Sequence, residues 1–74
     1  MKSVYVKLDG MQEINGFVDI LQKHKGEFDL KDGRYAVDAK SILGIFSLDT
    51  AGTLELVIYE EDDTIMDDLG SYLT

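Results

Sequence analysis

Apolar and polar residues alternate in four stretches of the chain, which is the pattern of half-buried β-strands. The four stretches span residues 4–9, 27–31, 34–39 and 54–59. In the last of them Leu54, Leu56 and Ile58 are expected to face the core. Asp32-Gly33 separates the second stretch from the third and is typical of a two-residue hairpin loop. The sequence therefore predicts that these two strands are antiparallel neighbours.

A helical spacing follows the first strand. Its apolar positions fall at i, i+3, i+4 and i+7 and are Ile14, Phe17, Val18 and Leu21. Gly10 is expected to end the preceding strand, and either Gln12 or Asn15 is predicted to begin the helix as its cap. Residues 23–25, a Lys-His-Lys run, are placed in its last turn, where positive charge suits the helix dipole, and a glycine follows at 26.

Two further helices are predicted near the middle and the end of the chain. The middle one is short, follows Ser41 and contains five large apolar residues, which are Ile42, Leu43, Ile45, Phe46 and Leu48. Residues 50–52 are expected to turn the chain into the fourth strand. The acidic run 60–63 is expected to end that strand and to start the last helix. Its apolar stripe consists of Ile65, Met66, Leu69, Tyr72 and Leu73.

The predicted order is strand, helix, strand, strand, helix, strand, helix. Four strands and three helices, each with one apolar face, fit an α+β fold, a two-layer open-faced sandwich with a mainly antiparallel four-stranded sheet. We expect the three helices to cover one face of the sheet and the other face to contact water. Residues 1–74 are predicted to form a single domain, since this length supports one modest core.

The charge balance narrows the class of partner. The chain has 15 acidic against 7 basic residues, a net charge of −8. Such a charge repels phosphate backbones and anionic membrane surfaces, so we expect neither a nucleic-acid nor a membrane partner. There is no cysteine, no apolar run approaches the roughly 20 residues that span a bilayer, and no signal-peptide pattern opens the sequence. These features favour a soluble, cytoplasmic protein. The charge serves solubility or a partner with a basic face.

Motifs of catalytic chemistry are missing from the sequence. It contains no glycine-rich phosphate loop, no nucleophile elbow and no spacing of metal ligands. The aspartates at 62, 63, 67 and 68 lack the pattern of a calcium loop and are interpreted as a solvated helix start. His24, the single histidine, is expected to be exposed and to be a poor general base. We therefore expect no enzymatic activity, no cofactor and no metal site.

The segment around Ser41 is the strongest candidate for function. Ser41 is predicted to cap the short helix. A two-turn helix buries one stripe only, so Ile42, Leu43 and Phe46 are candidates for an exposed docking surface. Phosphorylation of Ser41 would add negative charge at the edge of this surface; Asp38 is expected to oppose that charge and Lys40 to offset part of the repulsion. The alternative is a small core helix with an ordinary cap.

The stretch Lys40-Ser41-Ile42-Leu43-Gly44-Ile45-Phe46-Ser47-Leu48 resembles the regulatory-serine segment of HPr, the histidine-containing phosphocarrier of the sugar phosphotransferase system. The order of strands and helices is similar over essentially the whole chain. The family carries a Gly-x-His-x-Arg-Pro segment at the start of its first helix, whose histidine accepts the phosphoryl group. The matching stretch here is Gly10-Met11-Gln12-Glu13-Ile14-Asn15. Gln12, Ile14 and Asn15 thus stand at the histidine, arginine and proline, which resembles the glutamine-bearing catabolite-repression relative of HPr.

Three hypotheses follow from the resemblance and the residues. In the first, the chain is a non-catalytic HPr-like regulatory or binding protein, with Ser41 as a candidate phosphoserine. Its docking surface would be formed by Ile42, Leu43, Phe46 and the exposed side of the first helix. The implied partner is a protein, such as an HPr-type kinase or a transcription regulator. In the second, it is an active phosphocarrier with another acceptor, for which His24 is the single candidate. In the third, it is a plain interaction or dimerisation module.

Overall fold

Seven elements follow one another in the order that the hydrophobic pattern predicts. The computed structural model describes residues 1–48, 50, 52–59 and 63–74. The elements are β1 (Lys2–Lys7), α1 (Met11–Gln22), β2 (Phe28–Asp32), β3 (Tyr35–Asp38), α2 (Ile42–Phe46), β4 (Thr53–Ile58) and α3 (Asp63–Asp68). Residues 51 and 60–62, on which parts of the expected turn and of the expected acidic helix start fall, lie outside the described residues.

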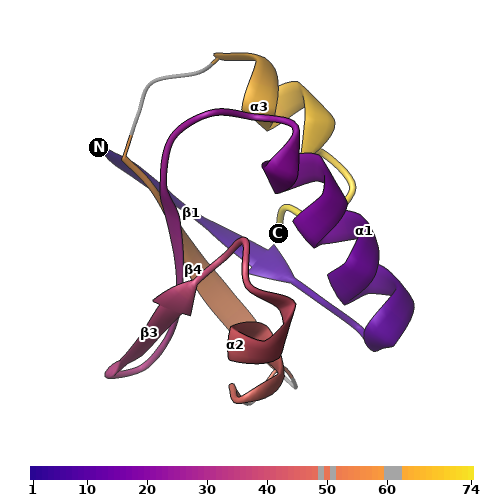
Figure 1. Ribbon diagram of the computed structural model, residues 1–74, viewed down its shortest axis with the longest axis vertical. Coiled ribbons are helices and arrows are strands. Elements are labelled where there is room, and N and C mark those ends of the chain that lie inside the picture. Colours follow the sequence, from indigo (N-terminus) through magenta and orange to yellow (C-terminus); the bar gives the residue numbers. More distant parts are fainter. Residues whose placement is uncertain (49, 51, 60–62) are drawn as a thin grey trace.

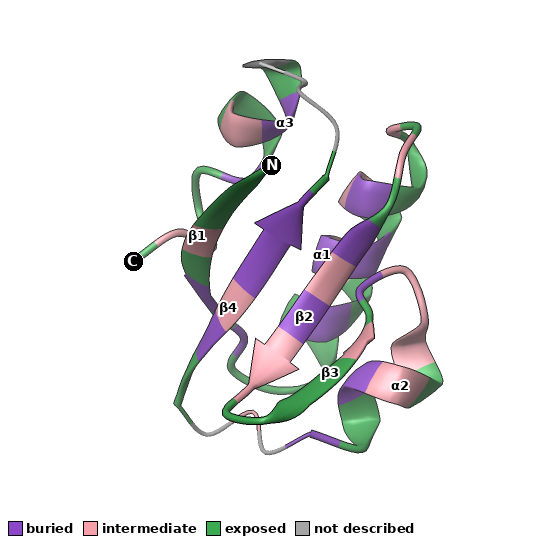
Figure 2. Cartoon of the chain, turned by 90° about the vertical axis from the view of Figure 1, so that its left-hand side faces the viewer, coloured by how far each residue is buried: buried purple, intermediate pink, exposed green. Residues whose placement is uncertain are grey.

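The strands form one sheet in the order β1-β4-β2-β3, and every neighbouring pair is antiparallel. Figures 1 and 2 show α1 and α3 on one side of this sheet and α2 beside β3, at the sheet edge. All three helical segments contribute to one core, through Phe17 in α1, Ile45 in α2 and Ile65 in α3. The α+β open-faced sandwich expected from the sequence is therefore confirmed, and its sheet is antiparallel throughout.

The hairpin between β2 and β3 differs from the prediction by one residue. Asp32 pairs with Tyr35, so the two loop residues are Gly33 and Arg34, not Asp32 and Gly33. Gly33 has φ +60°, and none of the described non-glycine residues has a positive φ. A two-residue loop with positive φ at its first position alone is the type II′ pattern, which places glycine first. Within this loop, the position of Gly33, its one residue with positive φ, is consistent with the observed pairing of Asp32 with Tyr35.

Helix α1 begins at Met11 without a side-chain cap, so the prediction that Gln12 or Asn15 caps it is wrong. Gly10 occupies the cap position with φ +96°, a conformation that other residues adopt at a cost, and its carbonyl accepts a hydrogen bond of 3.1 Å from the Ile14 N–H. The helix ends at Gln22. The Lys-His-Lys run at 23–25 therefore follows the helix and does not form its last turn, as had been expected.

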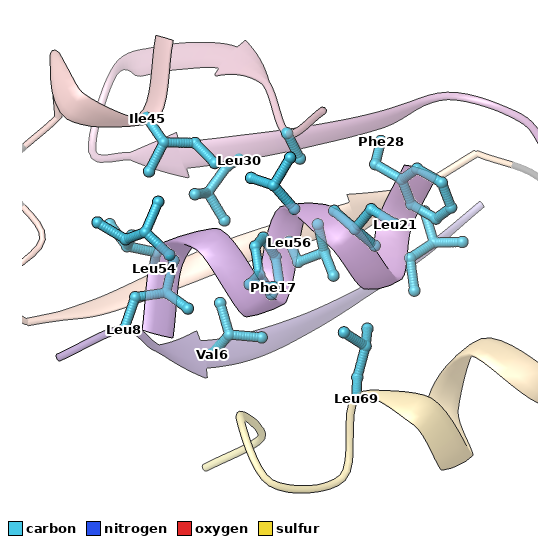
Figure 3. Packing of buried hydrophobic residues seen from close by; sticks show 14 of the residues in the cluster. Val6, Leu8, Phe17, Leu21, Phe28, Leu30, Ile45, Leu54, Leu56 and Leu69 are labelled. Atoms are coloured by element: carbon cyan, nitrogen blue, oxygen red, sulfur yellow. The ribbon is translucent and has the colours of Figure 1, made fainter. Parts of the chain in front are cut away.

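The core is built from every layer of the fold. Figure 3 shows Phe17 of α1 against Leu56 of β4, with Leu69 approaching from the end of α3. These three side chains are fully buried, and Val37 of β3 packs against the same cluster while partly buried. The expected core facing of Leu54, Leu56 and Ile58 is confirmed, since all three are buried.

The C-terminal residues close part of the β1 edge. Leu73 forms an antiparallel bridge with Val6, and the Thr74 N–H donates a 3.1 Å hydrogen bond to the Tyr5 carbonyl. Tyr72 stacks edge-to-face on Phe17, with ring centroids 5.8 Å apart. Gly16 is what permits this approach, because a Cβ there would lie 2.5 Å from the Tyr72 hydroxyl. The chain end is thus fixed to both β1 and α1.

Candidate functional site

Ser41 lies at the junction of β3 and α2 and caps the helix, as predicted. Its Oγ accepts a hydrogen bond of 3.2 Å from the Gly44 N–H, and its own N–H donates to the Asp38 carbonyl at 2.9 Å. The Asp38 carboxylate in turn accepts from the Lys40 N–H at 2.9 Å. The side chain of Ser41 is half-buried. These local hydrogen bonds fix the direction in which α2 leaves the sheet.

Helix α2 is only five residues long, and it divides its apolar side chains between the core and the surface. Ile45 is fully buried, and Ile42 is half-buried against the core. Leu43 is 80% exposed and Phe46 is 46% exposed. Of the three residues predicted to form a docking surface, two are therefore at the surface and one is shared with the core. Leu43 and Phe46 are named the α2 apolar pair below.

Gly44 determines how closely α2 packs on the sheet. A Cβ at this position would lie 3.2 Å from Cβ of Val37 and 3.4 Å from Oγ of Ser41. Such contacts are tighter than side chains normally adopt, so a larger residue would push α2 away from β3 and strain the cap. The absence of a side chain at Gly44 therefore permits the close approach of α2 to β3.

Lys40, which precedes Ser41, is held by residues far away in the sequence. Its Nζ donates a 2.7 Å hydrogen bond to the His24 carbonyl and lies 5.4 Å from the centre of the Phe28 ring. Its carbonyl accepts a 3.4 Å hydrogen bond from Nε2 of Gln22. The ammonium group is thus engaged at the end of α1, and the expectation that it offsets a phosphate on Ser41 is not supported by this geometry.

The three residues matched to the phosphoryl site of HPr do not share one surface. Gln12 and Asn15 are exposed in the first turns of α1, whereas Ile14 is 3% exposed and belongs to the core. Met11, beside Gln12, is also exposed. The first turn of α1 therefore presents an amide, an apolar side chain, the exposed carboxylate of Glu13 and backbone, and no cation comes from position 14.

His24 is not exposed, contrary to the expectation from its two lysine neighbours. Its side chain is 9% exposed, and its Nε2 lies 2.8 Å from Oδ2 of Asp68 in α3. Figure 1 shows α3 near the C-terminal end of α1, which is where His24 contacts Asp68. His24 thus connects these two elements, a role that sequence spacing gives no sign of, since 44 positions separate the partners.

The face of the sheet opposite the helices holds a second polar contact that sequence reasoning missed. The Tyr59 hydroxyl donates a hydrogen bond of 2.6 Å to Oδ2 of Asp29, across the β2–β4 pair. This bond is the main reason why the pKa of Tyr59 is raised above its ordinary value of 10.0; burial and the negative charges of Asp29 and Glu27 add to it. The protonated phenol is therefore favoured in the folded state.

This contact predicts an alkaline titration. The pKa of Tyr59 is raised in the folded protein. The stability that the protonated Tyr59 contributes through its hydrogen bond to Asp29 is therefore present below pH 10 and is lost as the pH rises through the folded pKa. The tyrosinate absorbance of the wild type minus that of Tyr59→Phe should have its midpoint above pH 10.0. In Asp29→Asn, which keeps the shape of the acceptor without its charge, the midpoint should move down. If the midpoint of this difference curve is at or below pH 10.0, the hydrogen bond between Tyr59 and Asp29 is contradicted.

Among the parts of the chain that the structure describes, no group of three or more acidic or histidine side chains is arranged to hold a metal ion. Within those ranges no helix combines the length and the apolar character needed to cross a bilayer.

Comparison with solved structures gives close matches of fold. The crystal structure of HPr-C-His from Thermoanaerobacter tengcongensis has a TM-score of 0.78 at 22% identity, over 96% of this chain and 89% of that one. The phosphocarrier protein HPr from Bacillus anthracis has a TM-score of 0.74 at 23% identity, over 99% and 94%. No protein-family model and no curated protein sequence matches the chain. The chain therefore has the HPr-like fold along nearly its whole length.

Proposed function

We propose that this chain is a non-catalytic HPr-like regulatory or binding protein that recognises a protein partner through α2. The observation that carries the proposal is the pairing of a cap, Ser41, with two exposed apolar side chains, Leu43 and Phe46, on one short helix. Exposed apolar side chains that are neighbours on one helix can form the apolar part of a protein interaction site. Ser41 is the candidate phosphoserine, because a phosphate there would place charge directly beside the α2 apolar pair.

The residues at the start of α1 support the proposal that the chain does not accept a phosphoryl group there. A glutamine amide is not a nucleophile at neutral pH, so Gln12 cannot accept a phosphoryl group as a histidine does. Ile14 is in the core and Asn15 is neutral, so these positions provide no positive charge to hold a phosphate. Backbone N–H groups of the first turn alone do not supply the missing chemistry.

The alternative acceptor, His24, has an unsuitable position for a phosphocarrier. A phosphoryl donor must reach a ring nitrogen in line, but the side chain is nearly covered and Nε2 is engaged with Asp68. It also lies beyond the C-terminal end of α1, whereas Gln12 lies in the first turn. The geometry therefore favours the regulatory proposal over an active carrier.

The charge of the chain limits the kind of partner. With a net charge of −8, the protein attracts a partner that has a basic face. The candidate partners are an HPr-type serine kinase and a transcription regulator, and the proposal requires that the partner present a basic face to this chain. The side chains Leu43 and Phe46 would supply the apolar centre of the contact and the acidic residues its polar rim.

Two labelling reactions test the proposal. Phosphoenolpyruvate with enzyme I of the phosphotransferase system is expected to leave the protein unlabelled, because no accessible nucleophile replaces the histidine. ATP with a purified HPr-type serine kinase is expected to add one phosphate, which intact-mass analysis detects and which Ser41→Ala abolishes. Ser47→Ala is the matched control, because Ser47 is an exposed serine at the other end of the same helix.

Each labelling reaction has an outcome that overturns one part of the proposal. A stoichiometric, acid-labile phosphate from phosphoenolpyruvate that disappears in His24→Gln would show an active carrier with another acceptor. Equal labelling of wild type and Ser41→Ala by the kinase would remove Ser41 as the regulatory site. An unlabelled protein in both reactions would leave only a plain interaction module.

A further inference from the structure

Three pairs of neighbouring residues in the sequence join an aspartate or an asparagine to a glycine. They are Asp9-Gly10, Asn15-Gly16 and Asp32-Gly33. In such a pair the backbone nitrogen of the glycine can attack Cγ of the residue before it, because a glycine has no side chain that shields this nitrogen. Asparagine reacts faster than aspartate in an unfolded chain, since its amide is neutral whereas the carboxylate is ionised at neutral pH. The sequence alone would therefore rank Asn15 first.

The fold protects Asn15, which lies inside α1. An amide at this position of an α-helix donates to the carbonyl four residues before it, so the Gly16 N–H is engaged with Gln12. Ring closure also requires Cβ of Asn15 and the Gly16 nitrogen to be nearly eclipsed about the Cα–C bond, which a helical ψ of about −42° does not allow. Gly16 is packed against Tyr72, whose hydroxyl would lie 2.5 Å from a Cβ at this position. Attack at Asn15 therefore requires local opening of α1.

The β2–β3 hairpin holds the second aspartate, Asp32. This residue is the last of β2, pairs with Tyr35 and is half-buried. An extended strand has a ψ of about +135°, which also keeps Cβ and the following nitrogen apart. Attack on Asp32 by the Gly33 nitrogen therefore requires the hairpin to open.

Asp9 differs from both, because it lies in the connection between β1 and α1 and belongs to neither element (Figure 1). Asp9 and Gly10 are both exposed, and a Cβ at Gly10 would have no neighbour within 4 Å. Among the residues that the structure describes, the Asp9 carboxylate has no hydrogen-bond or ion-pair partner, and the Gly10 N–H donates to no acceptor. No hydrogen bond of the two reacting groups therefore has to break for them to meet.

From this comparison we propose that Asp9 is a modification site, at which the folded protein converts aspartate into isoaspartate. The carboxylate takes up a proton from solvent, and the Gly10 nitrogen forms a bond to Cγ. The Gly10 amide proton and the protonated carboxyl oxygen leave as water, and a succinimide ring remains. A second water then opens the ring by giving a hydroxyl to one carbonyl carbon and a proton to the nitrogen.

The carbon that the second water attacks determines the product. Opening at Cγ restores Asp9. Opening at the main-chain carbonyl carbon of Asp9 breaks its bond to the Gly10 nitrogen, so that the chain continues through Cγ and the former carbonyl becomes a carboxylic acid. This acid returns a proton to solvent, and the conversion changes neither the mass nor the charge of the protein.

Isoaspartate adds one carbon atom to the main chain just before α1 begins. Both sides of this point are anchored, since Leu8 is fully buried and the Gly10 carbonyl accepts the 3.1 Å hydrogen bond from the Ile14 N–H. The longer connection strains these anchors, and we expect the modified protein to melt at a lower temperature. Its new carboxylate is the class of substrate that isoaspartyl carboxyl methyltransferases accept, with S-adenosylmethionine as the methyl donor. The proposal uses no residue of α2 and stands independently of the proposed function.

Ageing of the full chain tests the proposal. The purified protein is incubated at neutral pH in native buffer and, in parallel, in concentrated urea. Isoaspartate is then labelled by an isoaspartyl methyltransferase with S-adenosylmethionine that carries a radioactive methyl group, and electron-transfer fragmentation of tryptic peptides assigns the modified residue. In native buffer we expect at least about tenfold more isoaspartate at residue 9 than at residue 15 or 32, whereas in urea residue 15 should carry the most.

Glutamate provides the matched variants, because its extra methylene keeps the charge but requires a larger ring, which forms far more slowly. Asp9→Glu is expected to lose nearly all labelling in native buffer, and Asp32→Glu should keep it. The aged wild type should melt at a lower temperature than the fresh protein, and aged Asp9→Glu should melt like its own fresh sample.

Isoaspartate that forms mainly at residue 15 or 32 in native buffer would overturn the proposal, because the folded structure would then not select Asp9. So would equal labelling of aged wild type and aged Asp9→Glu. A wild type that stays unlabelled in native buffer, over a time in which half of the chain in urea has reacted at residue 9, would overturn it as well. An unchanged melting temperature of protein that is modified at residue 9 would contradict the expected strain at the start of α1.

Discussion

Replacing Leu56 by alanine is expected to lower the free energy of unfolding by about 2–5 kcal/mol. Leu56 lies on β4, the strand between β1 and β2, and is fully buried against Phe17 and the rest of the core (Figure 3). Truncation leaves a cavity that a closely packed sheet on a helix cannot close. A domain of 74 residues has a stability near the low end of about 5–15 kcal/mol, so this loss is a large share of the total.

Leu43→Ala is the matched control for this change. It removes the same atoms from a side chain that is 80% exposed, so its effect on stability should be within about 0.5 kcal/mol. Chemical denaturation should separate the two variants clearly, and the melting temperature of Leu56→Ala should fall by at least about 8 °C. A Leu56→Ala protein that melts within one or two degrees of the wild type would show that the facing of β4 is wrong.

Replacing Phe46 by alanine is expected to reduce recognition by the partner at least tenfold while the protein remains folded. Exposed aromatic side chains near the centre of an interface commonly account for about 2 kcal/mol or more of the binding free energy. With an HPr-type kinase as partner, the readout is kcat/KM for phosphorylation of Ser41. Leu43→Ala should act in the same direction, because its side chain lies on the same exposed face of α2.

Tyr5→Ala provides the control for Phe46→Ala. Tyr5 is another exposed aromatic residue, and it lies on β1, away from α2. It is expected to leave kcat/KM unchanged. Equal values for wild type, Phe46→Ala and Leu43→Ala would mean that α2 is a small core helix with an ordinary cap, and the regulatory proposal would fail.

The order and the type of the elements could be predicted from the sequence because each depends on local periodicity. Alternation with period two placed Leu54, Leu56 and Ile58 in the core, and the spacing of Ile14, Phe17 and Leu21 placed one face of α1 against the sheet. Ser41 was recognised as a cap because capping is a bond between residues three positions apart. Such features need no knowledge of the rest of the chain.

Boundaries were less predictable, because they depend on backbone angles at single residues. Gly10 begins α1 and Gly33 opens the hairpin loop, each with a positive φ. Sequence patterns indicate a glycine near a turn but do not fix which of its neighbours joins the loop. For this reason the cap of α1 is Gly10 and not Gln12 or Asn15, and the hairpin loop is one residue later than the expected Asp32-Gly33.

The tertiary structure alone decided the contacts of the polar residues. His24 reaches Asp68, Lys40 reaches the His24 carbonyl and Tyr59 reaches Asp29, over 44, 16 and 30 positions of sequence. Each contact depends on which strands and helices become neighbours, and that follows from burying all the apolar faces together. The sequence determined the faces of the elements and the cap of α2. Packing determined that Lys40 is held at α1, that His24 is covered, and that Leu43 and Phe46 remain at the surface.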